Sequence, residues 1–229
     1  MTLPDFLAKP IFHIVYEYMR KQRGTPIPPM IRKVDLPPEE KRLAFDHLLE
    51  SALQSGPSTP ISYNLPYPKI DFLHYICDWR RFVVHGSPLQ DLETLEPIRK
   101  SSDDNEFGNR QQIFCSPDAV WAMWFAILDK SKYGFTRNGC LRVGTGDRRL
   151  KYYHFELPKK NEADKPFTNG MIYICRAEDF PDKRPFPYLN LLNSEVEEWG
   201  SPKPVIPLAK MQVTPNDFPY LSQVQFSLE

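Results

Sequence analysis

The second half of the chain consists of short β-prone segments, and this pattern limits the folds open to it most strongly. Aromatic and β-branched residues dominate residues 150–157, 170–180, 205–215 and 223–228. Such residues favour strands, and no helical periodicity of useful length separates one segment from the next. A doubly wound parallel sheet, which needs crossover helices, is therefore disfavoured. We expect an α+β protein with a mostly antiparallel, strongly bent sheet.

Two glycine-containing sequences among these segments predict tight turns. Asn138-Gly139 is a dipeptide typical of two-residue hairpin loops. Gly144-Thr145-Gly146 resembles a phosphate-binding turn only superficially, and a hairpin turn explains it. The chain has no GxGxxG or GxxxxGK[ST] sequence, so the common nucleotide-binding folds are disfavoured.

Residues 1–65 are predicted to form a helical N-terminal extension to a main domain at residues 66–229. One helix should open at Pro10 and another at Glu39, because apolar side chains follow each at helical spacing. Proline-rich residues 25–38 should run extended between the two helices. The extension is expected to be a packing layer, a lid or a partner-binding surface. Its apolar positions are Phe12, Val15, Tyr16 and Met19 in the first helix and Phe45, Leu48, Leu49 and Ala52 in the second.

A strand that ends in His-Gly-Ser is the first candidate for a functional site. A helix over residues 69–79 leads into the sequence FVVHGSP at residues 82–88. The two valines favour extended backbone, whereas Gly86 permits dihedral angles that other residues avoid. The strand should therefore end there and leave His85 at its tip. Strand ends commonly present side chains and backbone amides to ligands.

The segment that follows is predicted to be a loop, a strand and a helix in turn. Residues 88–110 are polar, which predicts an exposed, mobile loop able to close over a ligand. Ile113–Cys115 should form a short buried strand. Ser116-Pro117-Asp118 has the capping hydroxyl, proline and early carboxylate that start a helix. The aromatic side chains of that helix, with helical spacing, are predicted to be core: Trp121, Trp124 and Phe125.

Three segments taken in order resemble the ADP-ribosyltransferase-like superfamily. They are FVVHGSP, QQIFCSPDAVWAMWFA at residues 111–126 and SEVEEWGSPKPVIPLAKMQV at residues 194–213. The likeness is to the His-Tyr-Glu branch, which includes diphtheria toxin and the poly(ADP-ribose) polymerases. Residues 68–222 as a whole resemble a divergent family of this superfamily. The resemblance implies a bent, split antiparallel sheet with flanking helices, NAD as a substrate, and no metal.

The resemblance also implies a role for individual residues. His85 would hydrogen-bond the adenosine ribose, and the Gly86 backbone and Ser87 hydroxyl would bind the nicotinamide amide. Phe114 stands where the branch has its stacking tyrosine, and it can stack but cannot hydrogen-bond. Glu198 would hold the ribose 2′-hydroxyl and stabilise the sugar cation, as carboxylates do in glycoside cleavage.

Two points stay open at the level of sequence. Glu195, Glu197 and Glu198 crowd one segment, and we favour Glu198 because it directly precedes Trp199 and a late strand. The function is the second open point. The protein could be an enzyme, either an NAD-dependent ADP-ribosyltransferase or an NAD glycohydrolase, or it could be a non-catalytic module of that fold. Such a module would bind a nucleotide, an ADP-ribosylated group or a protein. A third reading assigns the function to residues 1–65 as a helical protein-binding surface.

Composition argues against several other classes of protein. The 29 basic and 29 acidic residues balance, so no excess charge favours nucleic acid or an anionic membrane. No segment reaches the roughly 20 apolar residues of a membrane span, and we expect a soluble intracellular protein. The histidines, five in all, show no metal-ligand spacing with the cysteines, which disfavours a zinc site. The cysteines are expected to be buried free thiols: Cys77, Cys115, Cys140 and Cys175.

Overall fold

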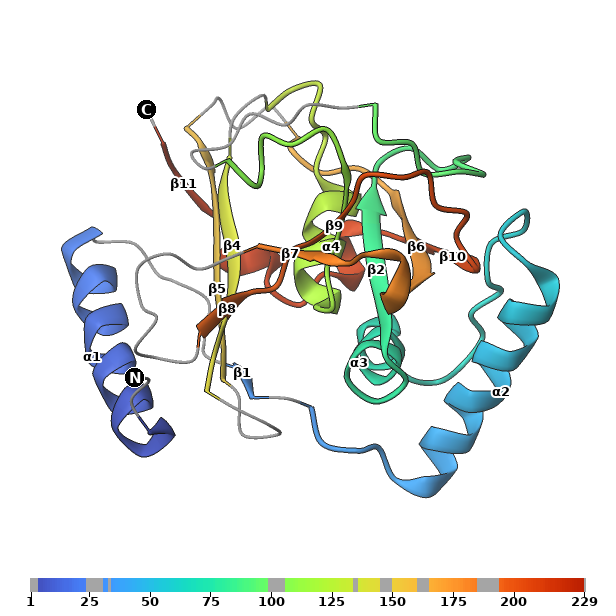
Figure 1. Cartoon of the computed structure of the whole chain (residues 1–229), viewed down its shortest axis with the longest axis horizontal. Coiled ribbons are helices and arrows are strands. Elements are labelled where there is room, and N and C mark those ends of the chain that lie inside the picture. Colours follow the sequence, from blue (N-terminus) through green and yellow to red (C-terminus); the bar gives the residue numbers. More distant parts are fainter. Residues whose placement is uncertain are drawn as a thin grey trace.

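The chain is an α+β protein with mixed, mostly antiparallel sheets and several helices (Figure 1). A computed structural model describes residues 4–23, 31–32, 34–98, 106–133, 136–144, 150–159, 165–184 and 194–228. The α-helices of these residues are α1 (Asp5–Arg23), α2 (Glu39–Ser55), α3 (Lys69–Trp79) and α4 (Ala119–Ile127). Short 3₁₀ helices lie at Ala177–Asp179, Pro215–Asp217 and Leu221–Gln223. In the described part of the chain, no helix is both long enough and apolar enough to cross a membrane.

The largest sheet is built around the hairpin of β4 and β5. Its strand order is β1 (Ile31–Arg32), β5 (Leu150–Pro158), β4 (Arg137–Val143) and β8 (Ser194–Val196), and β11 (Gln225–Leu228) pairs with β5. The β11–β5 pair is parallel and the other pairs are antiparallel. The helix α1 lies against the outer face of this sheet (Figure 1), where its Phe12 ring is 4.8 Å from that of Tyr152.

Two smaller antiparallel sheets meet at Val84 in the middle of β2. One has the order β10 (Ala209–Val213), β6 (Gly170–Arg176), β2 (Phe82–Ser87), and the other β3 (Ile113–Cys115), β9 (Trp199–Ser201), β7 (Asp182–Lys183). Val84 and Ser116 join the two sheets, because each N–H donates to the other's carbonyl at 2.9 Å. One isolated bridge thus connects the two sheets.

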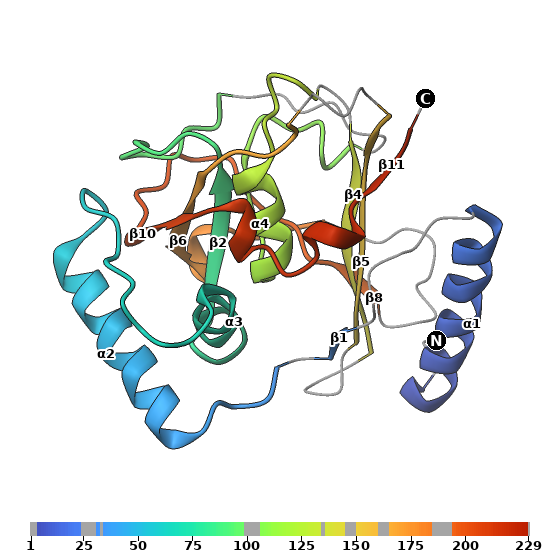
Figure 2. The same ribbon diagram turned by 180° about the vertical axis from the view of Figure 1, so that it is seen from behind.

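The helix α4 lies between the β2–β6 sheet and the β4–β5 sheet, as the two opposite views show (Figures 1 and 2). It is apolar on every side, and its Trp124 is fully buried in the main core. Two glycines let the helix backbone touch the sheet. A Cβ atom on Gly86 would lie 1.8 Å from the Ala122 carbonyl oxygen, and one on Gly170 1.9 Å from the Ala126 oxygen.

The contact between α4 and β2 explains Gly86 differently from the sequence, which predicted that this glycine allows the chain to turn. The strand β2 does not end at Gly86 but continues to Ser87. Gly86 is also absent from the residues with positive φ, which include Gly56 at the end of α2 and Gly144 after β4. The absence of a side chain is therefore needed for the close approach of α4, not for a turn.

The sequence suggested that the Ser116 hydroxyl caps α4. In the structure the cap is a buried carboxylate, that of Asp118. Asp118 accepts a hydrogen bond from the Trp121 N–H at 2.8 Å. The same carboxylate pairs with the buried Lys151 at 2.9 Å and accepts the Tyr153 hydroxyl at 2.6 Å. Burial alone would raise the pKa of Asp118, but Lys151 and the hydrogen bonds lower it to about 2. The start of α4 is therefore tied by charge to β5.

Most helices and strands predicted from the sequence are confirmed, but the start of the first helix and one predicted turn were wrong. The helix α1 begins before Pro10, because the Leu7 N–H already closes a turn onto the Pro4 carbonyl at 2.9 Å. Asn138-Gly139 makes no turn, since pairing with β5 holds it inside β4. The two strands join through residues 144–149, of which 145–149 lie outside the described residues. The side chains of Val15, Tyr16 and Met19 lie outside them as well.

The predicted loop at residues 88–110 is exposed only in part. Leu95 is buried and pairs with Val205 through two backbone hydrogen bonds of 2.8 and 3.0 Å, and Phe107 is also buried. Residues 99–105 lie outside the described residues. The cysteine prediction is confirmed, because all four thiols are free and buried.

Candidate functional site

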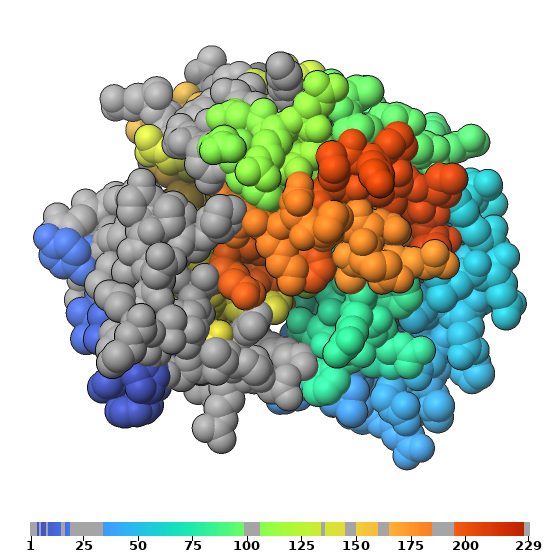
Figure 3. Space-filling model, viewed as in Figure 1, coloured from blue at the N-terminus to red at the C-terminus, as the bar shows by residue number. Residues whose placement is uncertain are grey.

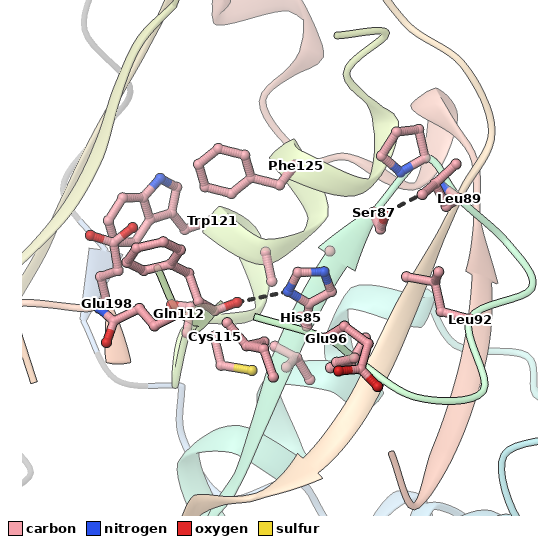
Figure 4. A pocket seen from close by; sticks show the side chains of 18 of the residues that line it. His85, Ser87, Leu89, Leu92, Glu96, Gln112, Cys115, Trp121, Phe125 and Glu198 are labelled. Carbon is pink, nitrogen blue, oxygen red and sulfur yellow. Dashed lines mark hydrogen bonds between the residues drawn. The ribbon is translucent and has the colours of Figure 1, made fainter. Parts of the chain in front are cut away.

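A pocket of about 430 Å³ lies beside the open edge of β2. His85, Gly86, Ser87, Phe114 and Glu198, the site residues suggested by the sequence, all line it. Figure 4 shows Glu198 and Ser87 at opposite ends of the pocket, with His85 between them. The chain after β2, residues 106–125 and residues 195–210 lie next to one another on the face seen in Figure 3. Segments far apart in the sequence therefore meet at this pocket.

The walls of the pocket are largely apolar and were not predicted as such. Trp121 and Phe125 project from α4 over His85, with ring centroids 6.1 Å apart (Figure 4). Both belong to the aromatic stripe that had been predicted as core, and Trp121 is indeed almost fully buried. The segment after β2 supplies the opposite wall, with Leu89, Leu92, Leu95 and Ile98.

His85 is held in one orientation and one tautomer. Its Nδ1 atom donates a hydrogen bond to the Phe114 carbonyl at 2.7 Å, so Nε2 is the acceptor nitrogen of the neutral ring. Burial lowers the pKa of His85 to about 4, although the bond to Phe114 opposes this shift; the charge of Lys130 lowers it further. His85 is therefore a neutral hydrogen-bond acceptor near pH 7.

Because the pKa of His85 is low, the free energy of unfolding should depend on pH through this residue. Between pH 6.5 and about 4 the unfolded chain protonates this histidine while the folded protein does not, so stability falls as the pH drops. The His85→Gln variant lacks this loss. Its free energy of unfolding in urea should therefore fall less between pH 7 and pH 4.5 than that of the wild type, by about 2 kcal/mol.

The matched control for this measurement is His47→Gln, on the exposed face of α2. It removes a histidine without touching the pocket. If His85→Gln and His47→Gln lose the same stability between the two pH values, the surroundings of His85 do not hold it neutral.

The backbone of Gly86 faces the pocket. The Val84 N–H and C=O point away from β6, because both bond to Ser116. Backbone groups of alternate residues point to the same side of a strand, so those of Gly86 point that way too. The N–H and C=O of Gly86 lie beyond the bridge between Val84 and Ser116, where the pocket begins. Ser87 follows on β2, and its Oγ accepts the Leu89 N–H at 3.2 Å.

The three clustered glutamates have three different environments. Glu198 immediately precedes β9, lines the pocket and pairs with Arg184 at 2.8 Å. Glu197 points into the protein and pairs with Arg142, although burial raises its pKa to about 7. Glu195 is exposed on β8. The choice of Glu198 as the pocket glutamate agrees with this geometry.

The arrangement offers a small ligand three kinds of contact. An aromatic slot is formed by Phe114, Trp121 and Phe125, and the Phe114 ring is further packed edge-on against Phe107 at 5.9 Å. The backbone N–H and C=O of Gly86 and the Glu198 carboxylate, which is paired with Arg184, also line the pocket. Within the described residues, no three His, Cys, Asp or Glu side chains gather as a metal site would require. The pocket therefore combines aromatic side chains with backbone hydrogen-bonding groups and one carboxylate.

No family model, no curated protein and no solved structure was found to match this chain.

Proposed function

We propose that the pocket binds NAD and that the protein transfers ADP-ribose from it, or hydrolyses it, with release of nicotinamide. The observation that carries this proposal is the meeting of His85, the Gly86 backbone and Glu198 in one pocket. These residues come from stretches that resemble the ADP-ribosyltransferase-like superfamily. The bent arrangement of antiparallel sheets around α4 is consistent with that fold.

The nicotinamide group suits the end of the pocket near Gly86. A primary amide both donates and accepts hydrogen bonds, and the N–H and C=O of Gly86 provide the complementary pair. The pyridinium ring carries a positive charge, which favours the aromatic faces of the slot around Phe114. The acceptor nitrogen Nε2 of His85 would take a hydrogen bond from a hydroxyl of the adenosine ribose.

The chemical step assigned to Glu198 is stabilisation of a sugar cation. The bond between the nicotinamide nitrogen and ribose C1′ breaks, and its electron pair leaves with the nicotinamide. The positive charge that develops on the ribose is opposite in sign to the carboxylate. Water or an acceptor hydroxyl then forms the new bond to C1′ and releases its proton to the solvent. Arg184 would hold the carboxylate in place through the 2.8 Å ion pair.

A non-catalytic module that binds the same class of ligand is the second candidate. Phe114 favours it, because phenylalanine lacks the hydroxyl that the tyrosine of the branch would supply. Turnover distinguishes the two candidates, since both predict binding.

Calorimetry with NAD is the direct test of binding. Wild-type protein should bind NAD, and His85→Ala should bind it about 2- to 12-fold more weakly, the effect of one lost neutral hydrogen bond. His47→Ala is the control and should bind like the wild type. Nicotinamide release is then followed by chromatography. Binding without release, even with candidate acceptors, would favour the non-catalytic module, and absence of binding by the wild type would refute the proposal.

A further inference from the structure

The strand β3 connects His85, to which the proposed function assigns ligand binding, with Glu198, to which it assigns the chemical step. On one side, the Phe114 carbonyl accepts the His85 imidazole N–H at 2.7 Å. On the other side, β3 pairs with β9, so that Cys115 lies opposite Trp199, the residue after Glu198. His85 and Glu198 therefore both depend on the position of one three-residue strand.

Ser116, directly after β3, adds a bond to the peptide group that leads to Glu198. Its hydroxyl donates to the Glu197 carbonyl at 2.6 Å and accepts the Asp118 N–H at 2.9 Å. The N–H of the same Glu197–Glu198 peptide donates to the Val196 carbonyl at 2.8 Å. Both polar groups of this peptide are therefore bonded, which fixes the direction in which the chain presents Glu198.

The surroundings make the Ser116 bond difficult to replace. Ser116 is only 6% exposed, so water has little access to the Glu197 carbonyl if the hydroxyl is removed. The Glu197 N–H is already committed to the Cys140 carbonyl at 3.0 Å. Without the hydroxyl, the Glu197 carbonyl would lose this donor, and the Glu197–Glu198 peptide could rotate toward another one.

We propose that Ser116 is a positioning residue that sets the place of the Glu198 carboxylate relative to a ligand held at His85 and Gly86. This inference rests on the proposed function. Ser116 itself lines the pocket, but its hydroxyl is bonded to the Glu197 carbonyl, so we assign it a role through the main chain of Glu197. Misplacement of a catalytic group by about 1 Å can lower a rate about 100-fold while other contacts keep the substrate bound.

Steady-state kinetics of nicotinamide release with Ser116→Ala, Ser116→Thr and Ser201→Ala test the proposal. Ser201→Ala is a matched control, because Ser201 is also buried, lies on β9 opposite Ile113 and donates its hydroxyl to the Lys203 carbonyl at 3.1 Å. Ser116→Ala should lower kcat by about 10- to 100-fold and change KM by less than about threefold. Ser116→Thr keeps the hydroxyl and should recover most of the lost kcat.

The outcomes separate this inference from the function on which it rests. An active wild type with a kcat for Ser116→Ala no lower than that for Ser201→Ala would overturn the positioning role alone. A general loss of structure is recognised by thermal unfolding, and it would lower kcat in the threonine variant as well. If the wild type binds NAD but releases no nicotinamide, the catalytic function fails first, and the role of Ser116 in it fails with it.

Discussion

Replacing Glu198 with glutamine is expected to lower kcat for nicotinamide release by at least about 100-fold and to leave NAD affinity within about threefold. Glutamine keeps the size of the side chain and can still accept a hydrogen bond from Arg184. It removes the negative charge, which matters most when positive charge develops on the ribose. Interactions that strengthen only in the transition state appear in kcat and not in binding. Calorimetry and chromatographic detection of nicotinamide measure the two effects separately.

Glu195→Gln is the matched control for this experiment. It makes the same substitution three positions earlier, at an exposed residue of β8, and should leave kcat unchanged. Glu197→Gln is less suitable, because it would break the buried pair with Arg142 and alter folding as well. A kcat for Glu198→Gln equal to that for Glu195→Gln would show that Glu198 does not act in the reaction.

The predictions that the structure confirms depend on local sequence. The helix α3 begins after Pro68, and the strand β2 begins at Phe82, as the sequence indicated. Here the apolar periodicity and the proline signal act within a few residues, and tertiary packing agrees with them. The resemblance of three short segments to a known superfamily also predicted that His85 and Glu198 would share a pocket. Both residues line the same pocket.

The parts that sequence did not predict depend on contacts between distant segments. Asn138-Gly139 has a strong hairpin preference, yet all seven residues of β4 pair with β5 and three of them also pair with β8, and this pairing overrides the dipeptide. Trp121 and Phe125 have the helical spacing of core residues, and nothing in that spacing distinguishes a core face from a pocket wall. The pairing of Lys151 with Asp118 joins residues that only the folded chain brings together.

The role of Gly86 also depends on a contact between distant segments that the sequence did not predict. We expect replacement of this glycine to have a large effect on stability. Replacing it with alanine should lower the free energy of unfolding by about 3–5 kcal/mol, because the new methyl group would meet main-chain atoms. Besides the Ala122 oxygen at 1.8 Å, an added Cβ would lie 2.8 Å from the Ala122 carbon and 2.9 Å from the Ala126 nitrogen. Backbone cannot move aside as a flexible side chain can, so α4 would have to shift from the sheet. Gly170→Ala, which meets the Ala126 carbonyl, should have an effect of the same size.

Gly139→Ala is the matched control, because it adds the same methyl group to a glycine within a strand. An ideal Cβ at Gly139 has no other atom within 4 Å, so this variant should be neutral or more stable by about 0.5–1 kcal/mol. Urea unfolding of the three variants and the wild type gives the comparison, with the midpoint read at constant m-value. Equal midpoints for Gly86→Ala and Gly139→Ala would mean that α4 does not rest directly on β2. The wall of the pocket that carries Trp121 and Phe125 would then be free to move relative to His85, and the geometry on which the proposed function depends would not hold.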